Sequence, residues 1–274
     1  MSAPRAPRDH PRSDAPRDPA SRNSAGVVRE AEGRQAGRRD ERAAPRCLIV
    51  NADDFGQASG INRGVIEAHE RGIVTSASMM VRWSAAAEAA AYAHARPTLS
   101  LGLHVDFGEW AFRDDTWVPV YQVASTDDAE VVASEVESQL AAFRRLVGRD
   151  PTHLDSHQHA HRHEPVRSIF VELARQLGVP LRECSSAVRY SGAFYGQTGK
   201  GEPYPRAITV DALIDIVESL RPGTTELGCH PGLGDDLDTM YRDERLQEVR
   251  SLCDPRVRAA IVRGGVQLRS FTSP

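Results

Sequence analysis

The chain has 274 residues, 40% of them hydrophobic, which is enough for one large α/β domain or two small ones. Its formal net charge is −4, but residues 1–46 carry 11 Arg against seven Asp and Glu, so the rest of the chain carries −8. An acidic folded part argues against a domain that binds nucleic acid, and no hydrophobic run approaches the length of a membrane span.

Residues 1–46 are rich in Arg, Pro, Ser and Ala and have almost no large aliphatic side chains. Such a segment cannot bury enough apolar surface to offset its ordering entropy, and it lacks the apolar core of a secretory signal. We expect a disordered extension followed by a single domain over 47–274. The four cysteines are widely spaced with no CxxC pair, which favours a reducing, cytoplasmic location.

From Cys47 onward, short apolar runs alternate with longer segments whose apolar residues recur at helical spacing. Strands are predicted at 47–50, within 73–81, and at 99–104, 152–154, 179–182, 225–229 and 266–270. Helices are predicted at 61–71, 85–95, 128–147, 165–177, 211–220, 241–253 and 254–263. Long loops are predicted at 106–123 and 185–205. The alternation indicates parallel βαβ units, and the absence of a Gly-rich phosphate motif favours a barrel-like sheet of about seven strands.

Potential metal ligands follow several of the predicted strands at the point where each strand ends. The acids are Asp53 and Asp54 after the first strand and Asp155 after the fourth; the imidazoles are His104, His157 and His230. Because the carboxyl ends of parallel strands share one edge of a sheet, we expect these side chains to lie close together.

One carboxylate and two imidazoles suit zinc, manganese, nickel or cobalt and leave positions open for water and substrate, whereas magnesium prefers more oxygen ligands. The alternative for Asp53 and Asp54 is a solvated turn in which one acid caps the next helix. His159, His161 and His163 could equally line a solvated loop or support the ligands.

Six segments together resemble the YdjC-like carbohydrate deacetylase family of the chitooligosaccharide type. They are NADDFG at 51–56, GIVTSASMM at 72–80, LGLHVD at 101–106, THLDSHQHAH at 152–161, VPLRE at 179–183 and ELGCHPG at 226–232. The resemblance spans nearly all of 47–274. It implies a distorted (β/α) barrel of mostly parallel strands and a divalent metal ion, most often zinc or magnesium. It also implies hydrolysis of an N-acetyl group by a metal-activated water.

Carried over position by position, the resemblance implies roles for six residues. The implied metal ligands are Asp54, His104 and His157. Asp53 is the implied general base, and Arg182 is implied to orient it. His230 is implied to contact the substrate or to act as the acid, where a histidinium would protonate the leaving amine.

The sequence departs from the chitooligosaccharide branch after His104, where Asp106, Phe107, Gly108 and Glu109 stand in place of an expected Thr and Gly. The aromatic residues of the predicted loop 106–123 could stack on a sugar ring or pack the loop itself. The expected substrate is therefore an N-acetylated amino sugar, oligosaccharide or glycolipid. The alternatives are a metal-dependent phosphoesterase or a non-catalytic carbohydrate-binding protein. The family also suggests a homodimer.

Overall fold

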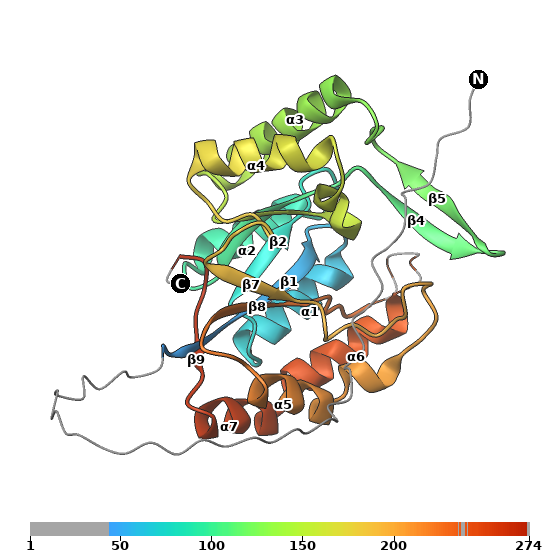
Figure 1. Cartoon of the computed structure of the whole chain (residues 1–274). Helices are drawn as coiled ribbons and strands as arrows, with labels where there is room; N and C mark the ends of the chain where they lie inside the picture. Colours follow the sequence, from blue (N-terminus) through green and yellow to red (C-terminus); the bar gives the residue numbers. More distant parts are fainter. Residues whose placement is uncertain (1–43, 235, 237–238, 240, 273–274) are drawn as a thin grey trace, which may run out of the picture.

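Seven strands form one sheet in this computed structural model, which describes residues 44–234, 236, 239 and 241–272 (Figure 1). The hydrogen-bonded order is β6-β3-β2-β1-β8-β7, and β9 pairs with the start of β1. The strands are β1 Arg46–Phe55, β2 Ser76–Met79, β3 Ser100–Val105, β6 Leu154–Ser156, β7 Val188–Ser191, β8 Gly223–Cys229 and β9 Gln267–Leu268. The predicted disorder of 1–46 falls outside the described residues except for the last three positions.

Every pairing in this sheet is parallel, so the carboxyl ends of the strands meet at one end of the barrel. In the described part of the chain no ladder joins β6 to β7, and a single isolated bridge between Leu154 and Leu181 adds the last rung beside β6. The predicted barrel-like sheet of about seven mostly parallel strands is confirmed, with this break as its distortion.

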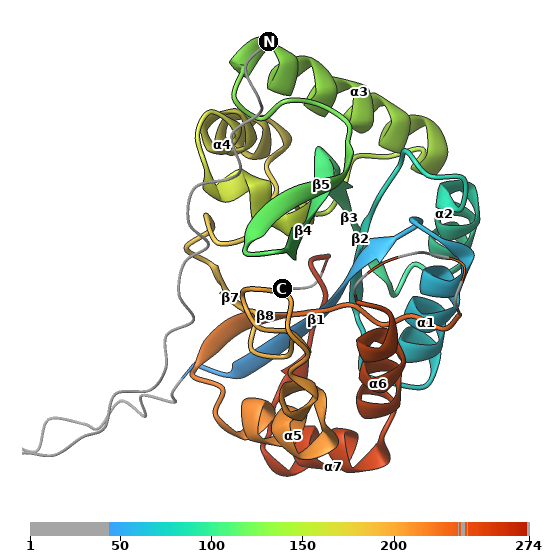
Figure 2. The ribbon, with the colours of Figure 1, turned by 90° about the vertical axis from the view of Figure 1, so that its right-hand side faces the viewer.

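Helices cover the outside of the sheet in three groups (Figure 2). The first group, α3 and α4, lies on one side of the sheet, and the second, α5, α6 and α7, lies on the opposite side. The third group, α1 and α2, lies beside β1 and β2. Their bounds are α1 Ser59–Glu70, α2 Ala86–Ala95, α3 Ala129–Val147, α4 Val166–Leu177, α5 Val210–Glu218, α6 Arg242–Leu252 and α7 Pro255–Arg263. Two 3₁₀ segments are η1 His157–Arg162 and η2 Pro205–Ile208. Among the described helices, none has the length and apolar character needed to cross a membrane.

Local sequence explains where the longest helix begins and ends. The Asp128 carboxylate accepts hydrogen bonds from the backbone N–H groups of Glu130 and Val131, which satisfies two donors at the start of α3. Gly148 ends α3 in the left-handed conformation, with φ 76°. Valine, leucine and phenylalanine at helical spacing then face the core.

The predicted loop at 106–123 is wrong, because this segment forms an antiparallel hairpin of β4 Gly108–Arg113 and β5 Thr116–Gln122. Asp114 and Asp115 make its two-residue turn, with φ of 49° and 58°. A two-residue hairpin turn of this kind needs positive φ at both positions, and Asp adopts positive φ more readily than most non-glycine residues. The hairpin projects from the barrel at the end of β3 (Figures 1 and 2).

Two further predictions differ from the structure. Residues 179–182 form no strand and contribute only the isolated bridge at Leu181, where Leu154 donates to the carbonyl of Pro180 and accepts from the N–H of Arg182. The predicted loop at 185–205 contains β7, which pairs with β8 and completes the sheet.

Candidate active site

Asp53 and Asp54 lie inside β1, which runs five residues beyond the predicted end at Val50. Adjacent side chains on a regular strand point to opposite faces of a sheet. Here the pairing of β1 with β2 shifts register between Ala52 and Phe55, and Asp54 has φ 64°. A bulge of this kind re-aims side chains, so both carboxylates reach the same end of the barrel.

The turn after the two acids is fixed by Gly56 and Asn62. Gly56 has φ 94°, and a Cβ at this position would lie 2.8 Å from the carbonyl oxygen of Met80. Its N–H donates to Asn62 Oδ1 at 2.7 Å, and Asn62 Nδ2 donates to the carbonyl of Ala85 at 3.0 Å. The backbone that carries the acids is therefore held from both sides.

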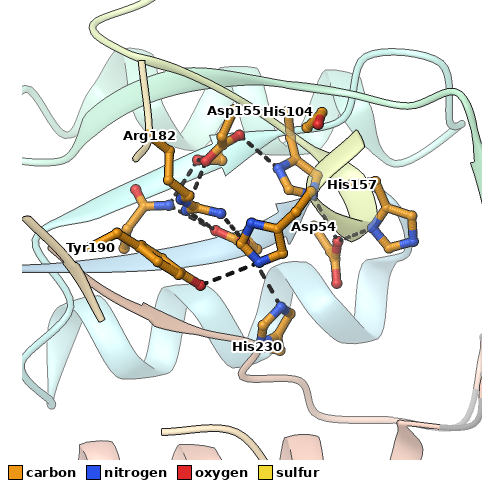
Figure 3. A network of polar contacts seen from close by, with 12 residues as sticks. Asp54, His104, Asp155, His157, Arg182, Tyr190 and His230 are labelled. Atoms are coloured by element: carbon orange, nitrogen blue, oxygen red, sulfur yellow. Dashed lines mark hydrogen bonds and ion pairs between the residues drawn. The ribbon is translucent and has the colours of Figure 1, made fainter. Parts of the chain in front are cut away.

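Asp54 Oδ1 is the point on which two imidazoles converge (Figure 3). It lies 3.4 Å from His104 Nε2 and 3.1 Å from His157 Nδ1. Ligands about 2.1 Å from a cation stand about 3.0–3.4 Å from one another, so these separations fit one small divalent ion. Asp54 Oδ1 is buried and accepts no hydrogen bond of acceptable geometry within the described chain. These three atoms all lie within 4.8 Å of one another, and we call Asp54, His104 and His157 the candidate metal triad.

His104 is oriented by Asp155, its neighbour across the β3–β6 ladder. His104 Nδ1 and Asp155 Oδ1 are 2.7 Å apart, which directs Nε2 toward Asp54. Burial lowers the pKa of His104, but the carboxylates of Asp155, Asp54 and Asp53 outweigh burial and raise it to about 9. A carboxylate behind a histidine is the usual arrangement behind a metal-ligating imidazole.

Arg245 on α6 contacts the other oxygen of Asp54. Its Nη2 donates to Asp54 Oδ2 at 2.7 Å. Burial alone would raise the pKa of Asp54, but the guanidinium and the two imidazoles hold it well below its usual value. Sequence reasoning missed Arg245 because α6 is charged along most of its length and gives no sign of which residue turns inward.

Arg182 binds three buried carboxylates from three strands, and Figure 3 shows its contact with one of them, Asp155. It donates to both oxygens of Asp53 at 2.6 and 2.7 Å and to Glu226 Oε1 at 2.7 Å, and it lies 2.7 Å from Asp155 Oδ2. The Tyr190 ring lies 4.8 Å from the guanidinium carbon. One positive charge cannot offset three negative ones. Burial accordingly raises the pKa of Glu226 to about 7 despite Arg182.

His230 directly follows β8, and its Nε2 lies 3.8 Å from Asp53 Oδ2. Burial lowers the pKa of His230 to about 4 against the pull of the nearby carboxylates. The imidazole of His230 is therefore neutral at pH 7. The rings of Tyr195 and Tyr241 stack on each other and pack edge-on against His230, and Tyr195 is 37% exposed.

Two other groups of ligand-type side chains converge nearby. In the first, His159 Nδ1 and His161 Nε2 lie 3.6 and 3.8 Å from Glu183 Oε2, but Arg162 donates to both Glu183 oxygens. His161 is buried and supports its own segment through Ser156, at 2.8 Å from Nδ1 to Oγ.

The second group is Asp53, His104 and Asp155, in which Arg182 binds both carboxylates. Asp54 differs because Arg245 donates only to its Oδ2 and leaves Oδ1 to the two imidazoles. Of the three groups, the triad around Asp54 therefore has the carboxylate oxygen best placed to bind a cation.

Comparison with known proteins places these features in one family. The family model described as YdjC-like protein matches residues 47–263. A carbohydrate deacetylase of Geobacillus stearothermophilus is 32% identical over 255 residues, which cover 83% of this chain and 97% of the relative. A chitooligosaccharide deacetylase of Klebsiella pneumoniae is 32% identical over 253 residues, covering 82% and 98%. The solved structure of a proposed cellobiose-phosphate cleavage protein from Enterococcus faecalis matches with a TM-score of 0.66 and 25% identity, covering 84% of this chain and 98% of that one.

Proposed function

The chain belongs to the family described as YdjC-like proteins, and we propose that it is a metal-dependent deacetylase that removes the N-acetyl group of an amino sugar, oligosaccharide or glycolipid. The observation that carries the proposal is the unpartnered Oδ1 of Asp54 between His104 and His157, beside an Asp53 held by Arg182. The names of the two curated relatives support the reaction class.

Asp54 Oδ1, His104 Nε2 and His157 Nδ1 would hold the ion. Two imidazoles and one carboxylate favour zinc, manganese, nickel or cobalt, with magnesium as the family's other choice. A divalent ion at this position polarises the acyl oxygen and lowers the pKa of water. The remaining steps belong to side chains of the protein.

Asp53 serves as the general base through Oδ2. Its Oδ1 accepts hydrogen bonds from both Arg182 and Asn51, at 2.7 and 2.8 Å, whereas Oδ2 accepts one from Arg182. Oδ2 therefore keeps the lone pair that can take a proton from the attacking water. Arg182 fixes the carboxylate in this orientation, which places the base before substrate binds.

His230 serves as the acid. Because it is neutral at pH 7, it first receives the proton that Asp53 has taken, over the 3.8 Å between Asp53 Oδ2 and its own Nε2. It then donates that proton to the leaving amine as the C–N bond breaks, which releases the free amino sugar and acetic acid, whose carboxyl keeps the second proton of the water until it ionises to acetate. Asp53 returns to its ionised form, so the proton balance of one hydrolysis is complete.

The direct test is acetate release from N-acetylglucosamine, its oligomers and an N-acetylated glycolipid by purified protein, with and without a chelator. Activity should disappear in the chelator, return with added divalent ion and be lost in His157→Ala. The matched control is His163→Ala, which removes an exposed imidazole from the same segment.

Acetate release that survives both the chelator and His157→Ala would refute the metal mechanism. Hydrolysis of an aryl phosphate without acetate release would favour a phosphoesterase instead. Tight sugar binding with no turnover in metal-loaded protein would favour a non-catalytic binding protein.

A further inference from the structure

The β4–β5 hairpin reaches the candidate metal triad through Glu109. Glu109 Oε2 lies 3.8 Å from His157 Nε2, while the other ring nitrogen of His157 faces Asp54 Oδ1 at 3.1 Å. The two side chains are 14% and 13% exposed. His157 Nε2 is buried and has no hydrogen-bond partner among the described residues. A neutral imidazole can bind a cation through Nδ1 only when its proton is on Nε2, so an acceptor at Nε2 decides which nitrogen binds.

The backbone of the hairpin directs Glu109 toward His157. The pairing of β4 with β5 shifts register between Glu109 and Trp110, and a bulge of this kind beside a site re-aims a side chain. Gly108, just before it, has φ 136°, and a Cβ there would lie 2.7 Å from the carbonyl oxygen of Tyr121. The Gly108 N–H donates to Asp106 Oδ1 at 2.9 Å, which also accepts from the Tyr121 hydroxyl at 3.1 Å. The base of the hairpin is therefore fixed.

A second contact joins the hairpin to the segment that carries His157. The amide side chain of Gln158 donates to the carbonyl of Trp110 at 2.8 Å and accepts from the Trp110 N–H at 3.0 Å. The Gln158 amide thus binds both backbone groups of Trp110, as a neighbouring β-strand would. Gln158 directly follows His157, and Trp110 directly follows Glu109. The Gln158–Trp110 contact therefore lies next to the Glu109–His157 contact in both segments. Gln158 holds φ 47°, a left-handed conformation that a non-glycine residue adopts at a cost.

We propose that Glu109 is a positioning residue for the metal triad: it accepts the Nε2 proton of His157, so that Nδ1 faces the cation, and the Gln158–Trp110 pair holds it in place. The inference rests on the proposed function only in requiring that the triad binds a divalent ion. With this role for Glu109, the β4–β5 hairpin is part of the metal centre.

The test is the affinity of the metal-free protein for Mn²⁺ and Co²⁺, measured by calorimetry, with the visible spectrum of the Co²⁺ protein as a report on its ligands. Glu109→Ala should weaken binding about 10–100-fold, which is the usual effect of losing a partner behind a metal ligand, and should change the Co²⁺ spectrum. Glu109→Gln keeps an acceptor oxygen and should lose less. The control is Asp115→Asn, which removes the same charge from an exposed position on the same hairpin and should bind as wild type does.

Gln158→Ala tests how Glu109 is held. If Gln158 acts through Glu109, the double variant should bind metal no more weakly than Glu109→Ala alone, whereas additive losses would overturn the role of the Gln158–Trp110 pair. Circular dichroism of each metal-free variant establishes that it is folded. Should Glu109→Ala not fold, Glu109→Gln and its spectrum decide the question.

Wild-type affinity and an unchanged spectrum in the Glu109 variants would refute the inference. If wild-type protein itself binds neither ion, the proposed function fails instead, so the two failures are distinguishable.

Discussion

The ion pair between Arg245 and Asp54 should matter more to the metal-free protein than to the metal-bound one. Arg245→Met is the suitable change, because methionine keeps an apolar stem and removes the guanidinium. The broken contact is 2.7 Å long, and the two side chains are only 8% and 1% exposed. Asp54 would then lose its guanidinium partner and keep only the imidazoles of His104 and His157 as positive neighbours.

Removing one partner of a buried ion pair costs about 3–5 kcal/mol of folding stability. We expect a loss at the lower end of this range, about 3 kcal/mol, for Arg245→Met in a chelator, because the two imidazoles still offset part of the charge of Asp54. A divalent ion at Asp54 Oδ1 supplies positive charge in place of Arg245, and the variant no longer has a guanidinium that competes with the ion for the carboxylate. Its affinity for the ion should rise at least about tenfold, which increases the stabilisation by saturating metal by about 1.4 kcal/mol relative to wild type.

Urea unfolding of wild type and Arg245→Met, with chelator and with saturating Mn²⁺, measures both effects. The double variant Asp54→Asn/Arg245→Met removes both charges, so it should recover most of the stability lost in chelator and gain nothing from metal. An equal loss with and without metal would refute the reasoning, as would a single variant that is as stable as wild type in chelator.

The remaining predictions concern the other side chains of the site. Asp54→Asn should lose divalent-ion binding in calorimetry, whereas Asp53→Asn should bind the ion and lose acetate release; the same ion affinity in both variants would contradict this division of roles. Glu226→Gln should exceed wild type in stability by up to about 3 kcal/mol at pH 8 and by less at pH 5. The reason is that the folded chain keeps the Glu226 proton to about pH 7 while the unfolded chain releases it near 4.5, so wild-type stability falls as pH rises through this window. Urea titrations at the two pH values check the difference, and a pH-independent one would count against the raised pKa. His230→Gln should lower kcat with little change in KM; a raised KM at unchanged kcat would make His230 a binding residue.

Much of the fold follows from short-range patterns. The helices at 128–147 and 165–177 have apolar faces at helical spacing and end at glycines, and the structure has both within two residues of the predicted bounds. Where the alternation of apolar and polar residues is weaker, as at 106–123, the predicted loop is wrong. The hairpin at 108–122 alternates less regularly, and two of its aromatic side chains, Phe112 and Trp117, contact each other, with Lys200 over the Phe112 ring.

The grouping of Asp54, His104 and His157 could be expected from sequence because each ends or follows a strand of one parallel sheet. The bulge in β1 that lets Asp53 and Asp54 reach the same site could not be expected from sequence. It depends on how β1 pairs with β2, and the sequence shows only two consecutive aspartates.

The sequence by itself determined the helices, the strands around β1, β2, β3 and β8, and the types of ligand at the strand ends, because these depend on residues close together in the chain. Only the tertiary structure distinguishes the three candidate groups of ligands from one another. The distinction depends on where three arginines lie. Arg162 binds both oxygens of Glu183, and Arg182 binds both oxygens of Asp53 and one of Asp155. Arg245 binds only Oδ2 of Asp54, so Oδ1 faces the two imidazoles without an arginine. Arg245 is 191 positions from Asp54, and a contact over that separation is set by the packing of α6 against the barrel.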